Sequence, residues 1–260
     1  MLRFEKTLAL AICAAALNAA GTARATVLLT ETFSYADGEL VGATGSPWAA
    51  SSGTGTGQNL TVASGRVLLD DDRTQDAASA LSSNVTSGAI YASFDLTPLS
   101  TDRSTSTTGS QYFAHFVGTG GTSTFLGRVA PGIPSGTASG SIRLGASNDS
   151  ASASAFLDND LALDGTFKVV LKYDVATEAT TLYVNPTSES GGLTISDATD
   201  PNTPGTFTSF GLRQASALGD FFIDNLTVAT TFAEVAAVPE PAALGLLSLA
   251  GLAALRRRRA

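Results

Sequence analysis

Cysteine, histidine, tryptophan and charged residues are scarce in this sequence. Its 260 residues include one Cys, one His and one Trp, and charged residues make up only 15% of the chain. A coiled coil is excluded, because it needs a composition rich in charged helix formers. The single cysteine, Cys13, lies in an N-terminal segment that we expect to be removed. No disulfide can then form in the mature chain, so a buried core must stabilise it, with a metal ion as a further source.

Basic residues are few between the two ends of the chain. Residues 26–237 contain 8 Lys and Arg against 21 Asp and Glu, a net charge of −13. These basic residues are scattered singly, from Arg66 to Arg213. An anionic chain without a basic stripe binds nucleic acid and anionic membrane surfaces poorly. We therefore expect no nucleic-acid partner.

Residues 1–25 have the pattern of a secretion signal. Basic Arg3 and Lys6 precede an apolar run, and Ala23 and Ala25 place small residues at both specificity positions of a signal peptidase site. We expect the Sec translocon to export the chain and signal peptidase to cut after Ala25. Lipidation of Cys13 is disfavoured because Ile12 is too large for the residue before a lipidated cysteine.

The last 23 positions, 238–260, combine three features. Val238, Pro239, Glu240 and Pro241 precede an apolar segment at 242–255, and Arg256, Arg257, Arg258 and Arg259 follow it. The apolar segment as a helix spans about 21 Å of a bilayer core of about 30 Å, and the arginines extend it by snorkelling. The positive-inside rule keeps the arginines cytoplasmic and residues 26–237 outside. A plain tail anchor fits this pattern.

The same order of features resembles the PEP-CTERM sorting signal. The resemblance implies that an exosortase recognises Pro239-Glu240-Pro241 and processes the tail. The protein is then anchored transiently in the inner membrane by a short transmembrane helix and released to the cell surface or extracellular matrix. The expected organisation is a signal peptide (1–25, a helix), a body (26–237) and a sorting signal (238–260).

In the body, short apolar runs separated by turn residues predict an all-β fold, a two-sheet antiparallel sandwich. Residues 89–96 alternate, which places Ile90, Ala92, Phe94 and Leu96 on one face and Tyr91, Ser93 and Asp95 on the other. Residues 167–174 and 180–185 form the clearest strand pair. Further strands are expected at 27–35, 59–62, 66–69, 111–117, 124–129, 141–146, 207–214 and 220–229. Loops are expected at 42–58, 101–110, 147–156 and 186–206.

Several of these strands resemble those of concanavalin/laminin-G-like jelly rolls. The resemblance lies in Phe167 to Pro186, in the closing run Phe222 to Val228, and in the opening run Glu31 to Tyr35 with Gly38, Gly42 and Trp48. It implies a jelly roll whose first and last strands pair. It also implies a structural Ca²⁺ bridging those strands, for which Glu31 and Asp224 are the analogous pair.

The sequence carries no recognisable catalytic set. His115 is the one histidine that a Ser-His-Asp site would have to use, and no Gly-x-Ser-x-Gly elbow precedes a helix pattern. Glycosidases need two carboxylates flanking the scissile bond, and no strand carries such a cluster. Asp70, Asp71 and Asp72 are consecutive, so they cannot all lie on one face of a strand. A solvated strand end explains them. We expect that the protein is not an enzyme. A polysaccharide hydrolase or lyase is the less favoured alternative.

A sugar-binding surface needs aromatic rings with polar neighbours. The candidates are Trp48, near an expected loop, and Tyr91, His115, Arg128 and Arg143, each opposite an apolar set on its strand. For each aromatic residue, ordinary packing is the alternative. We expect an exported jelly roll that binds extracellular polysaccharide. The other interpretation is a structural matrix protein that self-associates.

Overall fold

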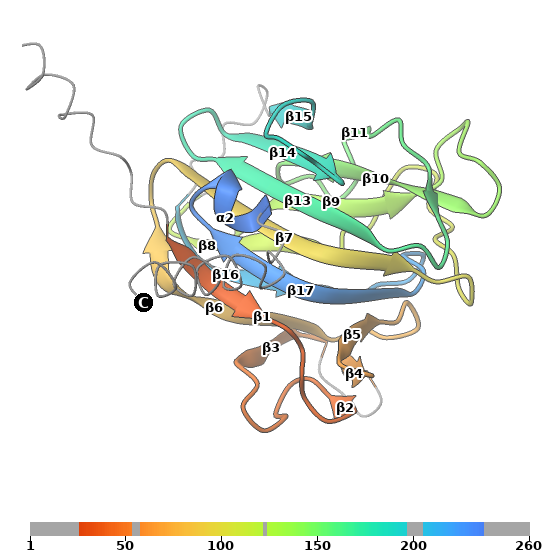
Figure 1. Ribbon diagram of the computed structural model, residues 1–260, viewed down its shortest axis with the longest axis horizontal. Helices are drawn as coiled ribbons and strands as arrows, with labels where there is room; N and C mark the ends of the chain where they lie inside the picture. The colour runs from red at the N-terminus through yellow and green to blue at the C-terminus, as the bar shows by residue number, and fades with distance from the viewer. Residues whose placement is uncertain (1–25, 54–57, 122–123, 197–204, 237–260) are drawn as a thin grey trace, which may run out of the picture.

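The computed structural model describes residues 26–53, 58–121, 124–196 and 205–236 (Figure 1). The expected signal peptide, the Pro-Glu-Pro motif and the apolar tail lie outside these residues. Within the described ranges, no helix is both long and apolar enough to cross a bilayer.

Two antiparallel sheets form the body of the protein. The first has nine strands, and its hydrogen-bonded path ends at β15 on one side and β2 on the other. In sheet order the path is β15 (Leu193–Ser196), β14 (Ala179–Val184), β13 (Phe167–Asp174), β7 (Ala89–Pro98), β17 (Phe221–Ala229), β5 (Arg66–Leu69), β4 (Thr61–Ala63) and β2 (Gly38–Glu39). The remaining strand, β1 (Val27–Glu31), pairs with β17.

The second sheet has eight strands and packs against the first. In sheet order it contains β11 (Ala155–Phe156), β10 (Ser141–Ser147), β9 (Phe125–Gly132), β8 (Ala114–Thr119), β16 (Thr206–Leu212), β6 (Asp76–Val85) and β3 (Trp48–Ser52), and β12 (Leu161–Ala162) pairs with β10. The expected two-sheet antiparallel sandwich is confirmed. The chain crosses repeatedly between the sheets, as in a jelly roll.

Alternation of side chains explains why the core lies between the sheets. On β7, Ile90, Ala92, Phe94 and Leu96 are fully buried in the main core, as their spacing predicts. Tyr91 faces the other way and belongs to a separate apolar cluster on the outer face. Rings from both sheets meet in the core: Phe94 lies 6.0 Å from Phe113 and 6.4 Å from Phe210. Burying one such ring contributes about 1.5–3 kcal/mol.

The first and last strands pair, as the resemblance to jelly rolls implies. Glu31 lies opposite Leu226 in the register of β1 and β17, and β1 runs along β17 in Figure 1. The chain then continues into a short helix, α2 (Phe232–Ala236). Its Phe232 ring packs against Tyr91 (6.3 Å) and Tyr183 (5.5 Å) on the outer face of the nine-stranded sheet.

Three strands of four or more residues lie where the sequence predicted none, as do the two-residue strands β2, β11 and β12. β6 is ten residues long and was not predicted, and β3 and β15 fall inside the expected loops 42–58 and 186–206. β6 consists largely of Ala and Ser, whose buried and exposed positions differ little in hydropathy. These residues fit a closely packed strand, but they do not show the alternation that predicts one. Pairing with β16 on one side and β3 on the other holds β6 in the sheet.

The carboxylate of Glu31 joins the two sheets. Glu31 is 5% exposed; its Oε1 accepts a hydrogen bond from the Phe33 amide (2.7 Å), and its Oε2 accepts one from the Tyr35 hydroxyl (2.6 Å). The same Oε2 accepts a hydrogen bond from Nε1 of Trp48 (3.1 Å), a residue of β3 in the opposite sheet. The Trp48 ring also packs against Phe33, 5.8 Å away. A buried polar group is stable only when it is hydrogen-bonded, and here three donors meet that need.

Replacing Glu31 with Ala removes the acceptor for these donors, two of which belong to buried residues. We expect Glu31→Ala to lower the free energy of unfolding by about 2–4 kcal/mol. The matched control is Glu39→Ala, because Glu39 is exposed. Urea unfolding followed by tryptophan fluorescence measures both. Equal unfolding midpoints for the two variants would contradict this account of Glu31.

Candidate functional site

A polar hollow of about 600 Å³ lies on the outer face of the nine-stranded sheet. Strands β13, β14 and β15 position its walls, because the side chains at alternate positions of each strand point away from the core. Lys172 and Asp174 come from β13, Thr181 and Tyr183 from β14, and Thr194 from β15. The intervening residues on β13, such as Leu171 and Tyr173, are buried in the core. The hollow therefore follows directly from strand alternation.

Glu189 closes one side of the hollow through a charged network. Its Oε1 accepts hydrogen bonds from Nζ of Lys172 and from the Tyr91 hydroxyl, both at 2.7 Å. Burial tends to raise the pKa of Glu189, but the hydrogen bonds from Lys172 and Tyr91 outweigh it and lower the pKa. Burial, and then the hydrogen bond to Glu189, raise the pKa of Tyr91 to about 12. At neutral pH, Glu189 is thus an ionised acceptor held beside a cation.

Hydroxyl and amide groups supply the rest of the lining. The Thr181 and Thr194 hydroxyls lie 3.2 Å apart. A second hollow of about 330 Å³ shares Tyr183 and Ser190 with the first and adds the amides of Asn159 and Asn185. Tyr183 is only 5% exposed, so its ring face is not available for stacking. Together the hollows offer hydrogen-bond donors and acceptors along an extended path.

A second cluster lies on the outer face of the eight-stranded sheet. Three neighbouring strands position it: Tyr112 lies just before β8, Arg128 lies in β9, and Arg213 directly follows β16. Backbone hydrogen bonds align these strands: the Phe113 amide donates to the Val129 carbonyl (2.9 Å) and the Arg213 amide to the Phe113 carbonyl (2.8 Å). The Cζ atoms of Arg128 and Arg213 lie 4.6 and 4.7 Å from the Tyr112 ring centroid.

His115 lies beneath this cluster and is 4% exposed. Its ring contacts Tyr112 (5.2 Å) and Phe125 (4.9 Å), and it rests on Gly211, where a Cβ atom would lie 2.5 Å from Nε2. Burial, and then the charges of Arg128 and Arg213, lower its pKa to about 3. Within the described residues, no hydrogen bond links His115 to a hydroxyl or carboxylate, so the structure brings no nucleophile and base together there. The predicted site residue is thus a neutral packing group.

The other predicted ligand contacts are not gathered into one site. His115, Arg128 and Arg143 lie on the eight-stranded sheet, whereas Tyr91 lies on the outer face of the nine-stranded sheet. Trp48 is 3% exposed and packs in the core, which was the alternative interpretation of this residue.

Arg143 is engaged by an acidic turn of the protein itself. Its Nη1 lies 2.8 Å from Asp158 and its Nε 2.6 Å from Asp160, and its Nη2 donates to the Gly136 carbonyl at 3.3 Å. These contacts use the carboxylates of the Asp158-Asn159-Asp160 turn to bind a guanidinium group.

The two residues expected to hold a calcium ion have separate partners. Three protein donors already occupy the Glu31 carboxylate. Asp224 accepts a hydrogen bond from the Asn225 amide (2.7 Å), and its charged neighbours are Asp95 and Arg66. Burial raises the pKa of Asp224 and repulsion from Asp95 adds to the rise, whereas the hydrogen bond from Asn225 and the charge of Arg66 oppose it. The Glu31–Asp224 pair therefore does not fit a calcium site, because Ca²⁺ needs several free oxygen ligands.

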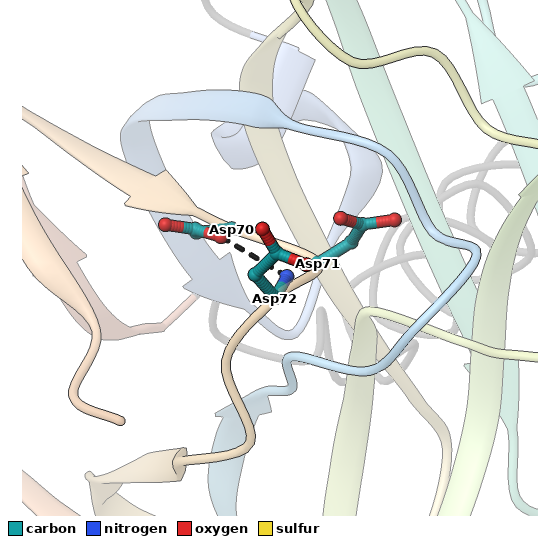
Figure 2. A group of neighbouring side chains, drawn as sticks. All are labelled: Asp70, Asp71 and Asp72. Atoms are coloured by element: carbon teal, nitrogen blue, oxygen red, sulfur yellow. Dashed lines mark hydrogen bonds between the residues drawn. The ribbon is translucent and has the colours of Figure 1, made fainter. Parts of the chain in front are cut away.

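Figure 2 shows the other group of carboxylates, Asp70, Asp71 and Asp72, whose ligand atoms lie within 4.8 Å of one another. Asp70 pairs with Arg73 (2.8 Å) and accepts a hydrogen bond from the Asp72 amide (3.0 Å). Asp71 accepts hydrogen bonds from the amides at 217 and 219. These contacts explain the group as a strand end that orders the neighbouring turn.

Asp71 and Asp220 lie close to each other at this corner, where the Asp71 amide donates to Asp220 at 3.3 Å. Burial raises the pKa of Asp71, and the charge of Asp102 raises it further. Burial also raises the pKa of Asp220, and repulsion from Asp70, Asp102 and Asp71 adds to it. The corner is therefore strained electrostatically at neutral pH.

Six residues of these two sites were not among the candidates chosen from the sequence: Lys172, Glu189, Thr181, Thr194, Tyr112 and Arg213. Lys172 and Thr181 carry a usable signal, because hydrophilic residues alternate with apolar ones on β13 and β14. Glu189 lies in an expected loop, and only its contact with Tyr91 and Lys172 distinguishes it from other loop acids.

No family model matches this chain, and no curated protein matches it either. Among solved structures, the chain is similar to the carbohydrate recognition domain of Emp47p, at 9% identity and a TM-score of 0.46 over 76% of this chain and 93% of that one. It is also similar to basic winged bean lectin with Tn-antigen, at 13% identity and a TM-score of 0.48 over 79% of this chain and 98% of that one. A sialidase is similar at 14% identity and a TM-score of 0.45, over 79% of this chain and 19% of that one. At these identities the likeness concerns the arrangement of strands alone.

The acidic corner predicts a pH-dependent effect. A carboxyl group whose pKa is raised on folding binds its proton more tightly in the folded state, so its contribution to stability falls as the pH rises through the folded-state pKa. Asp220→Asn removes this charge, and we expect it to raise the free energy of unfolding at pH 7 by about 0.5 kcal/mol. The gain should vanish below about pH 3, where the wild-type carboxyl is protonated in both states.

Thermal unfolding at several pH values measures this effect. Asp37→Asn is the control, because Asp37 also accepts a backbone hydrogen bond, from Ser64, and is exposed. A loss of stability in Asp220→Asn at pH 7, or a gain that persists at pH 3, would contradict the electrostatic account.

Proposed function

We propose that this protein is an exported, non-enzymatic polysaccharide-binding protein that an exosortase delivers to the cell surface or extracellular matrix. The observation that carries the binding proposal is the pair of adjoining polar hollows on the outer face of the nine-stranded sheet. Their hydroxyl, amide, ammonium and carboxylate groups match the donors and acceptors of sugar hydroxyls. Their shared wall at Tyr183 and Ser190 supports binding of a chain of sugars rather than one isolated unit.

The Lys172–Glu189–Tyr91 network supports this function because it is held in place without ligand. Glu189 accepts two hydrogen bonds of 2.7 Å, which fix its carboxylate over the sheet. In the described part of the chain, no donor is hydrogen-bonded to its second carboxylate oxygen. Preorganised groups reduce the ordering cost of binding a flexible polymer.

The hollow contains two carboxylates, so hydrolysis must be weighed against binding. A glycosidase needs one carboxyl group that keeps its proton near neutral pH. The pKa of Glu189 is lowered, and Asp174 accepts hydrogen bonds from the amides of residues 176 and 177 at 3.0 Å. The lowered pKa of Glu189 favours an ionised carboxylate that binds and does not protonate a leaving group, and the Asp174 carboxylate is engaged by its own turn.

Lys172→Met tests the hollow. The substitution keeps most of the side-chain volume but removes the ammonium group. We expect the affinity of the full-length protein for exopolysaccharide purified from the producing cells to fall about tenfold. Binding is measured by isothermal titration in mild detergent, with calcium and with a chelator, so that the calcium ion implied by the jelly-roll resemblance is tested in the same series.

Lys168→Met is the matched control, because Lys168 lies on the same strand and face, 3.8 Å from Asp95, and does not line the larger hollow. Saturable binding that Lys172→Met weakens and Lys168→Met does not is the expected result. Absence of saturable binding, or equal effects of the two variants, would contradict the proposal. Assembly without polysaccharide would instead favour the self-associating matrix protein, and release of reducing ends would favour a hydrolase.

The sorting part of the proposal is tested separately with Glu240→Ala. An exosortase that recognises the Pro-Glu-Pro motif should no longer process this variant, whereas signal peptidase should still remove residues 1–25. We expect the unprocessed form to accumulate in the inner membrane, as seen by immunoblotting of cell fractions. Normal tail processing in Glu240→Ala would overturn exosortase sorting and leave the polysaccharide-binding proposal unaffected.

A further inference from the structure

Two cations converge on one tyrosine ring on the face opposite the hollows. Arg128 and Arg213 both lie over Tyr112, with their Cζ atoms 4.6 and 4.7 Å from its centroid. Burial lowers the pKa of Arg128; Tyr112 and the charge of Asp149 raise it in part, and repulsion from Arg213 lowers it again. Residues 26–237 contain only 8 basic side chains against 21 acidic ones. Two of those few cations are thus held together although they repel, and a bound anion relieves that repulsion.

The protein's own carboxylates neutralise this pair only in part. Nε of Arg213 lies 3.8 Å from Asp76, and its Nη1 donates to the Gln111 side chain (2.7 Å) and to the Tyr112 carbonyl (3.3 Å). Arg128 makes no ion pair within the described residues; its Nε donates to the Phe125 carbonyl (3.0 Å), and Asp149 acts on it only at longer range. No described residue accepts a hydrogen bond from the terminal nitrogens of Arg128. A planar guanidinium with these groups available suits a carboxylate, which it binds through two parallel hydrogen bonds.

An apolar ring lies beside the cations. Phe125 is 37% exposed, and its ring is nearly perpendicular to that of His115, with 4.9 Å between the centroids. Because His115 is neutral at ordinary pH, the floor of the cluster adds no competing charge. An exposed aromatic ring packs against the C–H face of a sugar, while a neighbouring guanidinium binds its acid group.

We propose that Arg128, Arg213 and Phe125 form a second binding site, which takes the carboxylate-bearing sugar of an acidic polysaccharide, a uronic acid residue. The ring of the sugar lies on Phe125 and its carboxylate pairs with the guanidinium group of Arg128, while Arg213 adds positive charge to the site. This site lies on the eight-stranded sheet and shares no residue with the hollows of the nine-stranded sheet, so it stands or falls independently of them.

The test measures binding of full-length protein in mild detergent to alginate, whose sugars all carry carboxylates, and to carboxyl-reduced alginate of the same chain length. Isothermal titration should give saturable binding to alginate and at least tenfold weaker binding to the reduced polymer. Affinity for alginate should fall as salt increases. Dextran sulfate distinguishes a uronate site from a general polyanion site. Equal affinity for alginate and its reduced form, no alginate binding, or binding of dextran sulfate alone would overturn the proposal.

Variants locate the site. Arg128→Gln and Arg213→Gln should each weaken alginate binding about tenfold, and Arg128→Lys should keep part of it because the charge remains. Arg66→Gln is the matched control: Arg66 also lies over an aromatic ring, 3.8 Å from Phe222, but on the other sheet. Thermal melting followed by circular dichroism checks that each variant folds. If Arg213→Gln has a lower melting temperature than the wild type, the test rests on Arg128→Gln.

Unchanged alginate affinity in Arg128→Gln would overturn the site. Lys168→Met, which lies on the nine-stranded sheet and lines neither hollow, should bind alginate as the wild type does. If Lys172→Met loses alginate binding and Arg128→Gln keeps it, the uronate binds on the nine-stranded sheet, which would contradict a site at Arg128.

Discussion

The buried carboxylate of Glu31 is the contact on which the two-sheet body depends. It accepts hydrogen bonds from its own strand end and from Trp48 of the opposite sheet. In a chain expected to carry no disulfide after export, such a contact links the sheets where a covalent bridge is absent. Because β1 also pairs with the last strand, β17, the same residue ties the beginning of the body to its end. The resemblance that suggested a metal at Glu31 thus identified a structural position, whose partners are protein donors.

The two outer faces of the sandwich differ in chemistry although strand alternation produces both. On the nine-stranded sheet, hydroxyls and a Lys–Glu pair line open hollows, while α2 covers the neighbouring apolar patch around Tyr91 and Tyr183. On the eight-stranded sheet, Gly132 and Gly211 let rings approach the backbone closely: a Cβ atom would lie 2.7 Å from the Phe156 ring at the first position and 2.5 Å from the His115 ring at the second. Arg128 and Arg213 place positive charge on this sheet.

Much of this fold could be predicted from local patterns, whereas the sites could not. Alternation on β7 correctly separated Phe94 from Tyr91, and the β13–β14 pair stands where the sequence placed it. β6 was missed because Ala and Ser fit either face. Arg128 was selected from its strand, but its neighbour Arg213 is distant in sequence and reaches Tyr112 only through the order β9–β8–β16. Sheet order brings these side chains together, and no local pattern records it.

The most direct test of polysaccharide binding is amide NMR of the full-length protein during titration with oligosaccharides cut from the polymer of the producing cells. The account predicts saturable shifts at Lys172, Thr181, Glu189 and Thr194, which border the larger hollow. Uronate-containing fragments should also shift Arg128 and Phe125 on the opposite face. Shifts confined to other surfaces, or no saturable shifts at all, would contradict polysaccharide binding by this body.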